Sequence, residues 1–107
     1  TAVTVAPYFR RQGLARSLMK FLEDVSEKIH NGFYVDLFVR STNKVAITMY
    51  EKLGYKIYQT VDKYYSSDGI QPAEDAYDMR KSLKRDVKGE CSIPTGKTIK
   101  PNEIEFV

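Results

Sequence analysis

Apolar residues recur along the first third of the chain with the spacing of one helix face. After β-branched residues at 1–5 and a proline at position 7, aliphatic side chains step forward by three or four positions. The members of this stripe are Leu14, Leu18, Leu22, Val25 and Ile29. The pattern predicts a strand over residues 1–5, a loop over residues 7–12 and an amphipathic helix that Asn31 and Gly32 end.

The middle of the chain alternates between strand and helix patterns. Residues 33–39 are too evenly apolar for a half-exposed strand, so we expect a strand that is covered on both faces. A second helix is predicted from about residue 43 to residue 53, with Ser41 or Thr42 as its N-cap and Gly54 as the left-handed residue that follows it. Its expected apolar stripe consists of Val45, Ala46, Met49 and Leu53.

The last predicted strands form a hairpin. Residues 55–65 have the composition of a long strand, and a turn-rich loop separates them from a return strand around residues 76–82. The order β-α-β-α-β-β indicates an α/β fold with a mixed sheet, whose last two strands pair antiparallel.

From about residue 84 onward, charges, prolines and a glycine replace large apolar side chains. Residues 84–107 are therefore predicted to form a C-terminal tail without a core of its own, after a domain portion at residues 1–83. We expect the first strand to be the edge of a larger sheet, with further strands and helices upstream of residue 1.

Composition narrows the class of protein. The 107 residues are 42% hydrophobic and 29% charged, as in one small globular domain. The single cysteine, Cys91, cannot form an internal disulfide, and no apolar run is long enough to span a bilayer, so we expect a cytoplasmic protein that does not bind a membrane. The lone histidine, His30, has no partner at metal-ligand spacing, which predicts no metal site.

Charge is unevenly distributed along the chain. The net charge is +3, and the first 22 residues hold four basic side chains and no acidic one. The middle of the chain is acidic and the C-terminal end is basic again. This distribution favours a local anion site over a face that binds nucleic acid directly.

The strongest local motif is the strand-to-helix junction V-A-P-Y-F-R-R-Q-G-L-A at residues 5–15. Gly13 allows a close backbone approach, and the first-turn N–H groups of the helix have no partners within the helix. Arg10 and Arg11 add positive charge, so a phosphate or pyrophosphate suits this site. The alternative is an ordinary turn with solvated arginines. The junction is neither a Walker A loop nor a G-x-G-x-x-G fingerprint.

A second motif places Asn43 and Tyr50 seven residues apart, on nearly the same face of the second helix. An amide and a phenol aligned in this way can line a groove. The alternative is that Asn43 caps the helix and Tyr50 is a core aromatic residue.

Together the two motifs resemble the GCN5-related N-acetyltransferase (GNAT) superfamily over residues 1–83. The resemblance implies that residues 10–15 bind the pyrophosphate of acetyl-CoA through backbone N–H groups and that the strand from Val3 to Val5 lies along the pantetheine arm. It also implies that Asn43 contacts the cofactor and that Tyr50 donates a proton to the thioester sulfur. The residues implied to bind the cofactor are Val3, Val5, Arg10, Arg11, Gln12, Gly13, Leu14, Ala15 and Asn43.

Further segments resemble the catalytic subunits of the NatB class of eukaryotic N-terminal acetyltransferases. They include M-Y-E-K-L-G-Y at residues 49–55, K-Y-Y-S-S-D-G at residues 63–69 and the tail. This resemblance implies that Tyr64 and Tyr65 close over the first residues of a nascent protein beginning with Met followed by Asp, Glu, Asn or Gln. It also implies an auxiliary subunit and, through it, the ribosome as partners. The alternative for the tyrosine pair is two strand aromatics, one on each side of the sheet.

One position departs from the family. The bacterial ribosomal-protein alanine acetyltransferase has a glutamate base five residues before the motif asparagine, and this chain has Phe38 there. Asp36 lies nearby on the same strand face, as a catalytic carboxylate or as one paired within the sheet. A NatA-type enzyme, another GNAT N-acetyltransferase and a noncatalytic acyl-CoA-binding module remain as alternatives to a NatB-type enzyme.

Overall fold

Two α-helices and five strands follow one another in the computed structural model, which describes residues 2–5, 12–29, 31–65 and 72–104. The elements are β1 (Ala2–Val5), α1 (Gln12–Lys28), β2 (Tyr34–Arg40), α2 (Lys44–Lys52), β3 (Lys56–Tyr65), β4 (Glu74–Ser82), the 3₁₀ turn η1 (Glu90–Ser92), β5 (Thr98–Ile99) and the 3₁₀ turn η2 (Pro101–Glu103). The predicted order β-α-β-α-β-β is confirmed from β1 to β4. His30 lies outside the described residues.

The strands form one mixed sheet in the order β1-β2-β4-β3-β5. β1 pairs parallel with β2, whereas β4 pairs antiparallel with both β2 and β3. The predicted α/β class and the antiparallel pairing of β3 with β4 are therefore confirmed. β5 comes from the tail and was not predicted; it pairs parallel with β3, so the tail adds a strand to the sheet.

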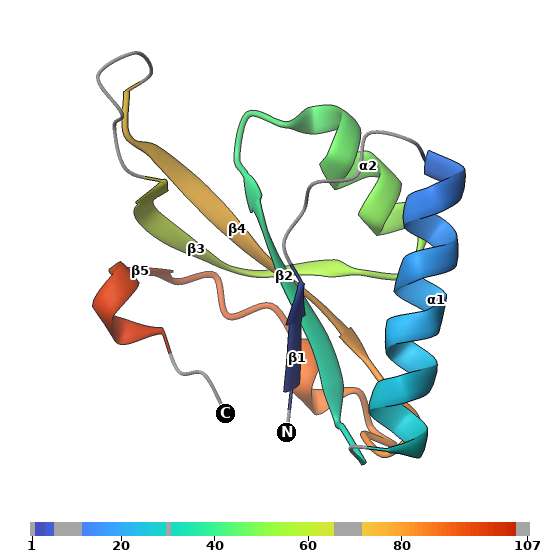
Figure 1. The fold of residues 1–107 in the computed structure, drawn as a ribbon. Helices are drawn as coiled ribbons and strands as arrows, with labels where there is room; N and C mark the ends of the chain where they lie inside the picture. The colour runs from blue at the N-terminus through green and yellow to red at the C-terminus, as the bar shows by residue number, and fades with distance from the viewer. Residues whose placement is uncertain (1, 6–11, 30, 66–71, 105–107) are drawn as a thin grey trace.

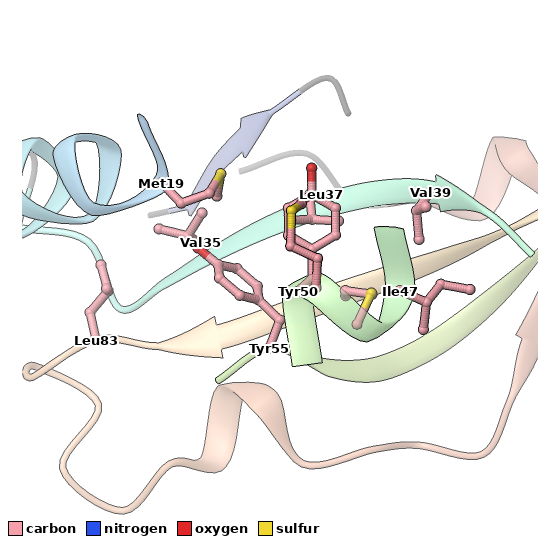
Figure 2. Packing of buried hydrophobic residues seen from close by; sticks show 10 residues of the cluster. Met19, Val35, Leu37, Val39, Ile47, Tyr50, Tyr55 and Leu83 are labelled. Atoms are coloured by element: carbon pink, nitrogen blue, oxygen red, sulfur yellow. The ribbon is translucent and has the colours of Figure 1, made fainter. Parts of the chain in front are cut away.

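Both α-helices cover the same face of the sheet, and the tail runs along the other side (Figure 1). The larger core cluster joins β2 to the two helices, with Val35, Leu37 and Val39 fully buried beside Met19 of α1 (Figure 2). A smaller cluster on the opposite face contains Phe38 of β2. The prediction that this strand is covered on both faces is confirmed. Neither described α-helix combines the length and apolar content that a membrane span requires.

The end of α1 differs from the predicted one. The helix ends at Lys28, and Ile29, expected on its buried face, is 72% exposed. Asn31 takes a left-handed conformation with φ +52°, and the Gly32 N–H donates to the Ser26 carbonyl across 2.8 Å. Ile29 still donates its N–H to the Val25 carbonyl across 2.9 Å, but its side chain faces solvent, and the left-handed Asn31 then turns the chain toward β2.

The start of α2 also corrects the prediction. Asn43, rather than Ser41 or Thr42, is the N-cap, because its side chain accepts from the Ala46 N–H, whereas the Ser41 N–H and both the N–H and the hydroxyl of Thr42 donate to β4. The helix consequently begins at Lys44 and turns Val45 outward, where it is 72% exposed, while Ile47 is buried. The left-handed Gly54 after the helix is confirmed, with φ +98°.

Candidate active site

The first predicted motif lies between β1 and α1. The connecting residues 6–11, among them Arg10 and Arg11, lie outside the described residues. The backbone alone is described for Val3, Val5, Gln12, Leu14 and Ala15. Gly13 is exposed in the first turn of α1, and a methyl group there would meet no described atom within 4 Å. Packing among the described residues therefore does not require a glycine at this position.

Asn43 is held at the beginning of α2 by its own backbone and side chain. Its N–H donates to the Arg40 carbonyl across 2.9 Å, and its Oδ1 accepts from the Ala46 N–H across 3.2 Å. The side chain is exposed. The capping alternative is thus confirmed as a structural role of Asn43. The cap uses the amide oxygen, so Nδ2 is the group of this side chain that can serve as a donor to a ligand.

Glu74 at the start of β4 binds the loop that precedes Asn43. Its carboxylate accepts hydrogen bonds from the N–H and Oγ1 of Thr42, and it pairs with Arg40 Nη1 at 3.3 Å. These hydrogen bonds, the one from the Thr42 hydroxyl first, hold the pKa of Glu74 below its ordinary value. Glu74 therefore joins the N-terminus of α2 to the hairpin that carries Tyr64 and Tyr65.

Tyr50 extends from α2 into the larger core cluster, where it is only 1% exposed (Figure 2). Its ring meets the Tyr55 ring edge to face, with the centroids 6.0 Å apart. Burial raises the pKa of the Tyr50 phenol, so the hydroxyl stays protonated in neutral solution. The alternative of a core aromatic residue describes its packing correctly. The same packing fixes the direction of the ring.

Tyr64 and Tyr65 both contact the smaller cluster, on the face away from the helices. The Tyr64 ring stacks on Phe38 at 4.9 Å between centroids, and Tyr65 meets Tyr64 edge to face at 5.2 Å. The Tyr65 hydroxyl donates to the Phe38 carbonyl across 3.3 Å, and the Arg40 guanidinium lies 4.2 Å from the centre of the Tyr65 ring. The alternative that the two tyrosines face opposite sides of the sheet is wrong.

The two groups of predicted site residues meet β2 from opposite faces. Pairing between β1 and β2 runs from Ala2–Tyr34 to Val5–Leu37, whereas β2 continues to Arg40. Side chains alternate along a strand, so Leu37 packs in the cluster of Tyr50 and Phe38 packs in the cluster of the tyrosine pair. Both groups therefore reach β2 at consecutive residues, at and next to Leu37 of the last described pair between β1 and β2.

Asp36 of β2 belongs to a polar group whose members on β4, Asp78 and Arg80, were missed by sequence reasoning. Asp36 is 5% exposed and lies 3.9 Å from Arg80 Nε, so the interpretation of Asp36 as a carboxylate paired within the sheet is confirmed. Asp78 beside it is 1% exposed, accepts from Gln59 Nε2 across 3.0 Å and lies 3.7 Å from Arg80 Nη2. Burial and the neighbouring Asp36 carboxylate raise the pKa of Asp78 to about 7. The surroundings of Asp78 depend on which residues of the adjacent strands β2 and β3 lie beside it, and no sequence motif indicates them.

A hollow of about 320 Å³ lies on the exposed side of α2. Its lining residues are Lys44, Val45, Thr48, Met49 and Lys52. The lining thus combines two lysines with the apolar side chains of Val45 and Met49. Among the described residues there is no group of three or more histidine, cysteine, aspartate or glutamate side chains that could hold a metal ion.

A comparison with models of protein families identifies the family of this chain. The family model described as Acetyltransferase (GNAT) family matches residues 1–55, which is more than half of the chain. The chain belongs to this family. The GNAT match covers the β1–α1 junction, Asn43 and Tyr50, so the resemblance drawn from the two sequence motifs is confirmed.

Individual GNAT relatives refine this placement. The chain is 54% identical over 106 residues to the N-terminal acetyltransferase B complex catalytic subunit NAA20 of Arabidopsis thaliana. The aligned residues make up 99% of this chain and 58% of the relative. The chain is 45% identical to the N-terminal acetyltransferase A complex catalytic subunit NAA10 of the same plant. This alignment covers 78% of this chain and 42% of the relative. The chain thus spans about three fifths of the NatB relative's length, and its likeness to NatB catalytic subunits is confirmed.

A solved structure shows the same arrangement of elements. The crystal structure of Chaetomium thermophilum Naa20 in complex with a bisubstrate analogue matches this GNAT chain with a TM-score of 0.76 and 39% identity. The match covers 92% of this chain and 57% of that one. The GNAT-like partial domain expected from the sequence is therefore confirmed as a fold.

Proposed function

We propose that the protein to which this chain belongs transfers the acetyl group of acetyl-CoA to the α-amine of nascent proteins that begin with Met followed by Asp, Glu, Asn or Gln. The observation that carries the proposal is that Tyr50 and the Tyr64–Tyr65 pair share their clusters with consecutive residues of β2, Leu37 and Phe38, next to the last described pair with β1. A thioester approaching from the Tyr50 side would meet an amine approaching from the tyrosine pair at this point of β2.

The residues fit acetyl-CoA. The first turn of α1 has backbone N–H groups for the pyrophosphate, and open space at Gly13 allows the ligand to approach them. Arg10 and Arg11 would add charge, and the backbone of Gln12, Leu14 and Ala15 belongs to the same turn. Val3 and Val5 would lie along the pantetheine arm, and Asn43 Nδ2 would donate to one of its carbonyls.

The hollow on α2 provides a place for the nucleotide end of the cofactor. Lys44 and Lys52 supply positive charge for a phosphate, and Val45 and Met49 supply an apolar surface for a base. This use would also cover Val45, which is 72% exposed because α2 begins at Lys44.

The proposed reaction is a direct transfer. The neutral amine attacks the thioester carbonyl carbon, the C–S bond breaks and the amine proton is lost to water. A backbone N–H near Val5 would stabilise the charge on the carbonyl oxygen. The leaving thiol resembles a cysteine thiol, whose pKa of about 8.5 lies below the value of about 10 for tyrosine, so Tyr50 needs only to hydrogen-bond the departing thiolate. Its raised pKa keeps the phenol proton available for this bond.

A strong general base is not required by this chemistry. An α-amine has a pKa of about 7.7–8.0, so a useful fraction is already neutral at pH 7. Phe38 occupies the position of the bacterial glutamate, and its ring stacks on Tyr64 instead. Asp36 is not a suitable substitute, because it is buried beside Arg80.

The NatB branch is supported by the extent of the match, which includes the tail. A phenol can donate to either a carboxylate or an amide, so Tyr64 and Tyr65 suit a mixed preference at the second residue of the substrate. With this branch come an auxiliary subunit, a position at the ribosome and a cytoplasmic location.

The test is an acetylation assay of the full-length protein with its auxiliary subunit on peptides that differ in their first two residues. We expect release of CoA thiol with Met-Asp, Met-Glu, Met-Asn and Met-Gln peptides and little with Ser-Ser. Equal rates on Met-Asp and Ser-Ser would favour a NatA-type enzyme. Binding of acetyl-CoA without thiol release on any peptide would favour a noncatalytic acyl-CoA-binding module.

A further inference from the structure

Tyr64 and Tyr65 are consecutive in β3, yet both rings contact the cluster of Phe38, Val61 and Ala76. In a regular strand, consecutive side chains point to opposite faces of the sheet. One of the two rings would then lie on the helix side. The backbone must therefore depart from regular strand geometry just before the pair.

The departure is a bulge centred on Lys63. Val61 pairs with Ala76 and Tyr65 pairs with Glu74, so β3 has two residues more than β4 across this interval. Lys63 takes a left-handed conformation with φ +47°, which is uncommon for a residue with a side chain. Extra residues in one strand bend it and redirect the side chains that follow.

Asp75 is the residue that holds this bulge from the opposite strand. Its Oδ1 accepts the Lys63 N–H across 2.9 Å, and its own carbonyl accepts the Ser41 N–H across 3.0 Å. The side chain thus binds the N–H of the one residue in β3 whose conformation is strained. The main chain of Asp75 also binds the loop that leads to Asn43.

We propose that Asp75 is a positioning residue for the peptide site: its carboxylate holds Lys63 in the left-handed conformation and so places Tyr64 on Phe38, beside Tyr65. This inference rests on the proposed function, because it assigns the geometry of the tyrosine pair to the reading of the substrate's first residues. Tyr65 is anchored through its hydroxyl to the Phe38 carbonyl, so a change at Lys63 is transmitted mainly to Tyr64.

Three variants of the full-length protein with its auxiliary subunit test the proposal. Asp75→Ala removes the acceptor, Asp75→Asn keeps an Oδ1 acceptor without the charge, and Lys63→Gly combined with Asp75→Ala supplies a residue that adopts positive φ without support. Asp62→Ala is the matched control, since Asp62 is an exposed acid in the same strand. For each variant, kcat and KM are measured for a Met-Asp peptide and for acetyl-CoA.

We expect Asp75→Ala to raise the peptide KM about tenfold while the KM for acetyl-CoA changes by less than about twofold. The peptide KM of Asp75→Asn and of the double variant should lie close to the wild-type value, and Asp62→Ala should resemble the wild type. Should Asp75→Ala fail to fold, a peptide KM near the wild-type value for both Asp75→Asn and the double variant supports the proposal. If Asp75→Ala does not fold, a raised peptide KM in Asp75→Asn or in the double variant overturns the proposal.

Other results would overturn the proposal. An unchanged peptide KM in Asp75→Ala, an equal rise in both KM values, or an Asp75→Asn variant as impaired as Asp75→Ala would each refute a positioning role of the Oδ1 acceptor. These results require an active wild type. Absence of turnover by the wild-type complex on every peptide would instead refute the proposed function itself, so the two failures are distinguishable.

Discussion

The Tyr55 hydroxyl donates a hydrogen bond to Glu23 Oε2 across 3.0 Å, joining the residue just before β3 to the middle of α1. Lys81 of β4 binds the other oxygen of the same carboxylate at 2.8 Å. Burial and the neighbouring Glu23 both raise the pKa of Tyr55. The Tyr55 ring in turn touches Tyr50, so this pair of residues supports the ring that we propose to act on the thioester.

Removal of this hydrogen bond should destabilise the fold. We predict that Tyr55→Phe lowers the free energy of unfolding by about 1–3 kcal/mol, because a partly buried carboxylate loses a charged hydrogen bond. Urea unfolding of wild type and variant measures the difference. Tyr58→Phe, which retains a ring against Arg80, is the matched control. A Tyr55→Phe variant as stable as the wild type would show that Glu23 does not depend on the phenol.

Local patterns were sufficient to predict the order of elements from β1 to β4, but not β5 in the tail. The three- and four-residue steps marked α1, and the left-handed Gly54 marked the end of α2. The errors at Ile29 and Val45 occur at helix ends, where the exact boundary decides which side chains face the core. At the start of α2, for example, Thr42 binds Glu74, 32 residues away, and is not available as the cap.

The sequence motifs were sufficient to predict which residues belong to the candidate site, but not how their side chains are arranged. Asn43 and Tyr50 could be singled out because their spacing is fixed within one helix. The placement of Tyr64 beside Tyr65 depends on a bulge, and strand alternation predicted the opposite. Glu23, Asp75 and Asp78 gained their environments only through strand register and helix packing, which a pattern along the chain does not specify.

Asn43 can be tested for its two roles separately. Asn43→Ala removes both the cap to Ala46 and the Nδ2 donor, whereas Asn43→Ser keeps a capping oxygen and removes the donor. We predict that both variants raise the KM for acetyl-CoA and that only the alanine variant loses stability, by about 1 kcal/mol. Steady-state kinetics and urea unfolding give the two quantities. Wild-type acetyl-CoA affinity in Asn43→Ser would contradict the proposed cofactor contact.

Asp78 should make stability depend on pH. Its pKa is about 7 in the folded chain and near 3.8 in the unfolded one, so between these values the unfolded chain releases a proton that the folded chain retains. The free energy of unfolding should therefore fall as the pH rises from about 4 to about 7. Asp78→Asn should remove this slope.

The measurement is urea unfolding of both proteins at several pH values across this range. Glu74, whose pKa lies below its ordinary value, gives the opposite slope in more acidic solution and is common to both proteins. The difference between wild type and Asp78→Asn therefore isolates Asp78. Parallel profiles for the two proteins would show that Asp78 is ionised in the folded state across the whole range.

Tyr50→Phe tests the chemical step. The variant keeps the ring that packs against Tyr55 and Leu37 and removes only the hydroxyl, so the fold and the KM for acetyl-CoA should change little. We predict a fall in kcat of at least about tenfold, because the departing thiolate loses a positioned donor. Burial raises the pKa of Tyr50, so ionisation of this phenol should not reduce wild-type kcat as the pH rises from about 6 to about 9. Tyr77→Phe, a second tyrosine at the edge of the same cluster, is the control. Unchanged turnover in Tyr50→Phe would show that the departing thiolate does not need the phenol donor and would leave Tyr50 a packing role alone.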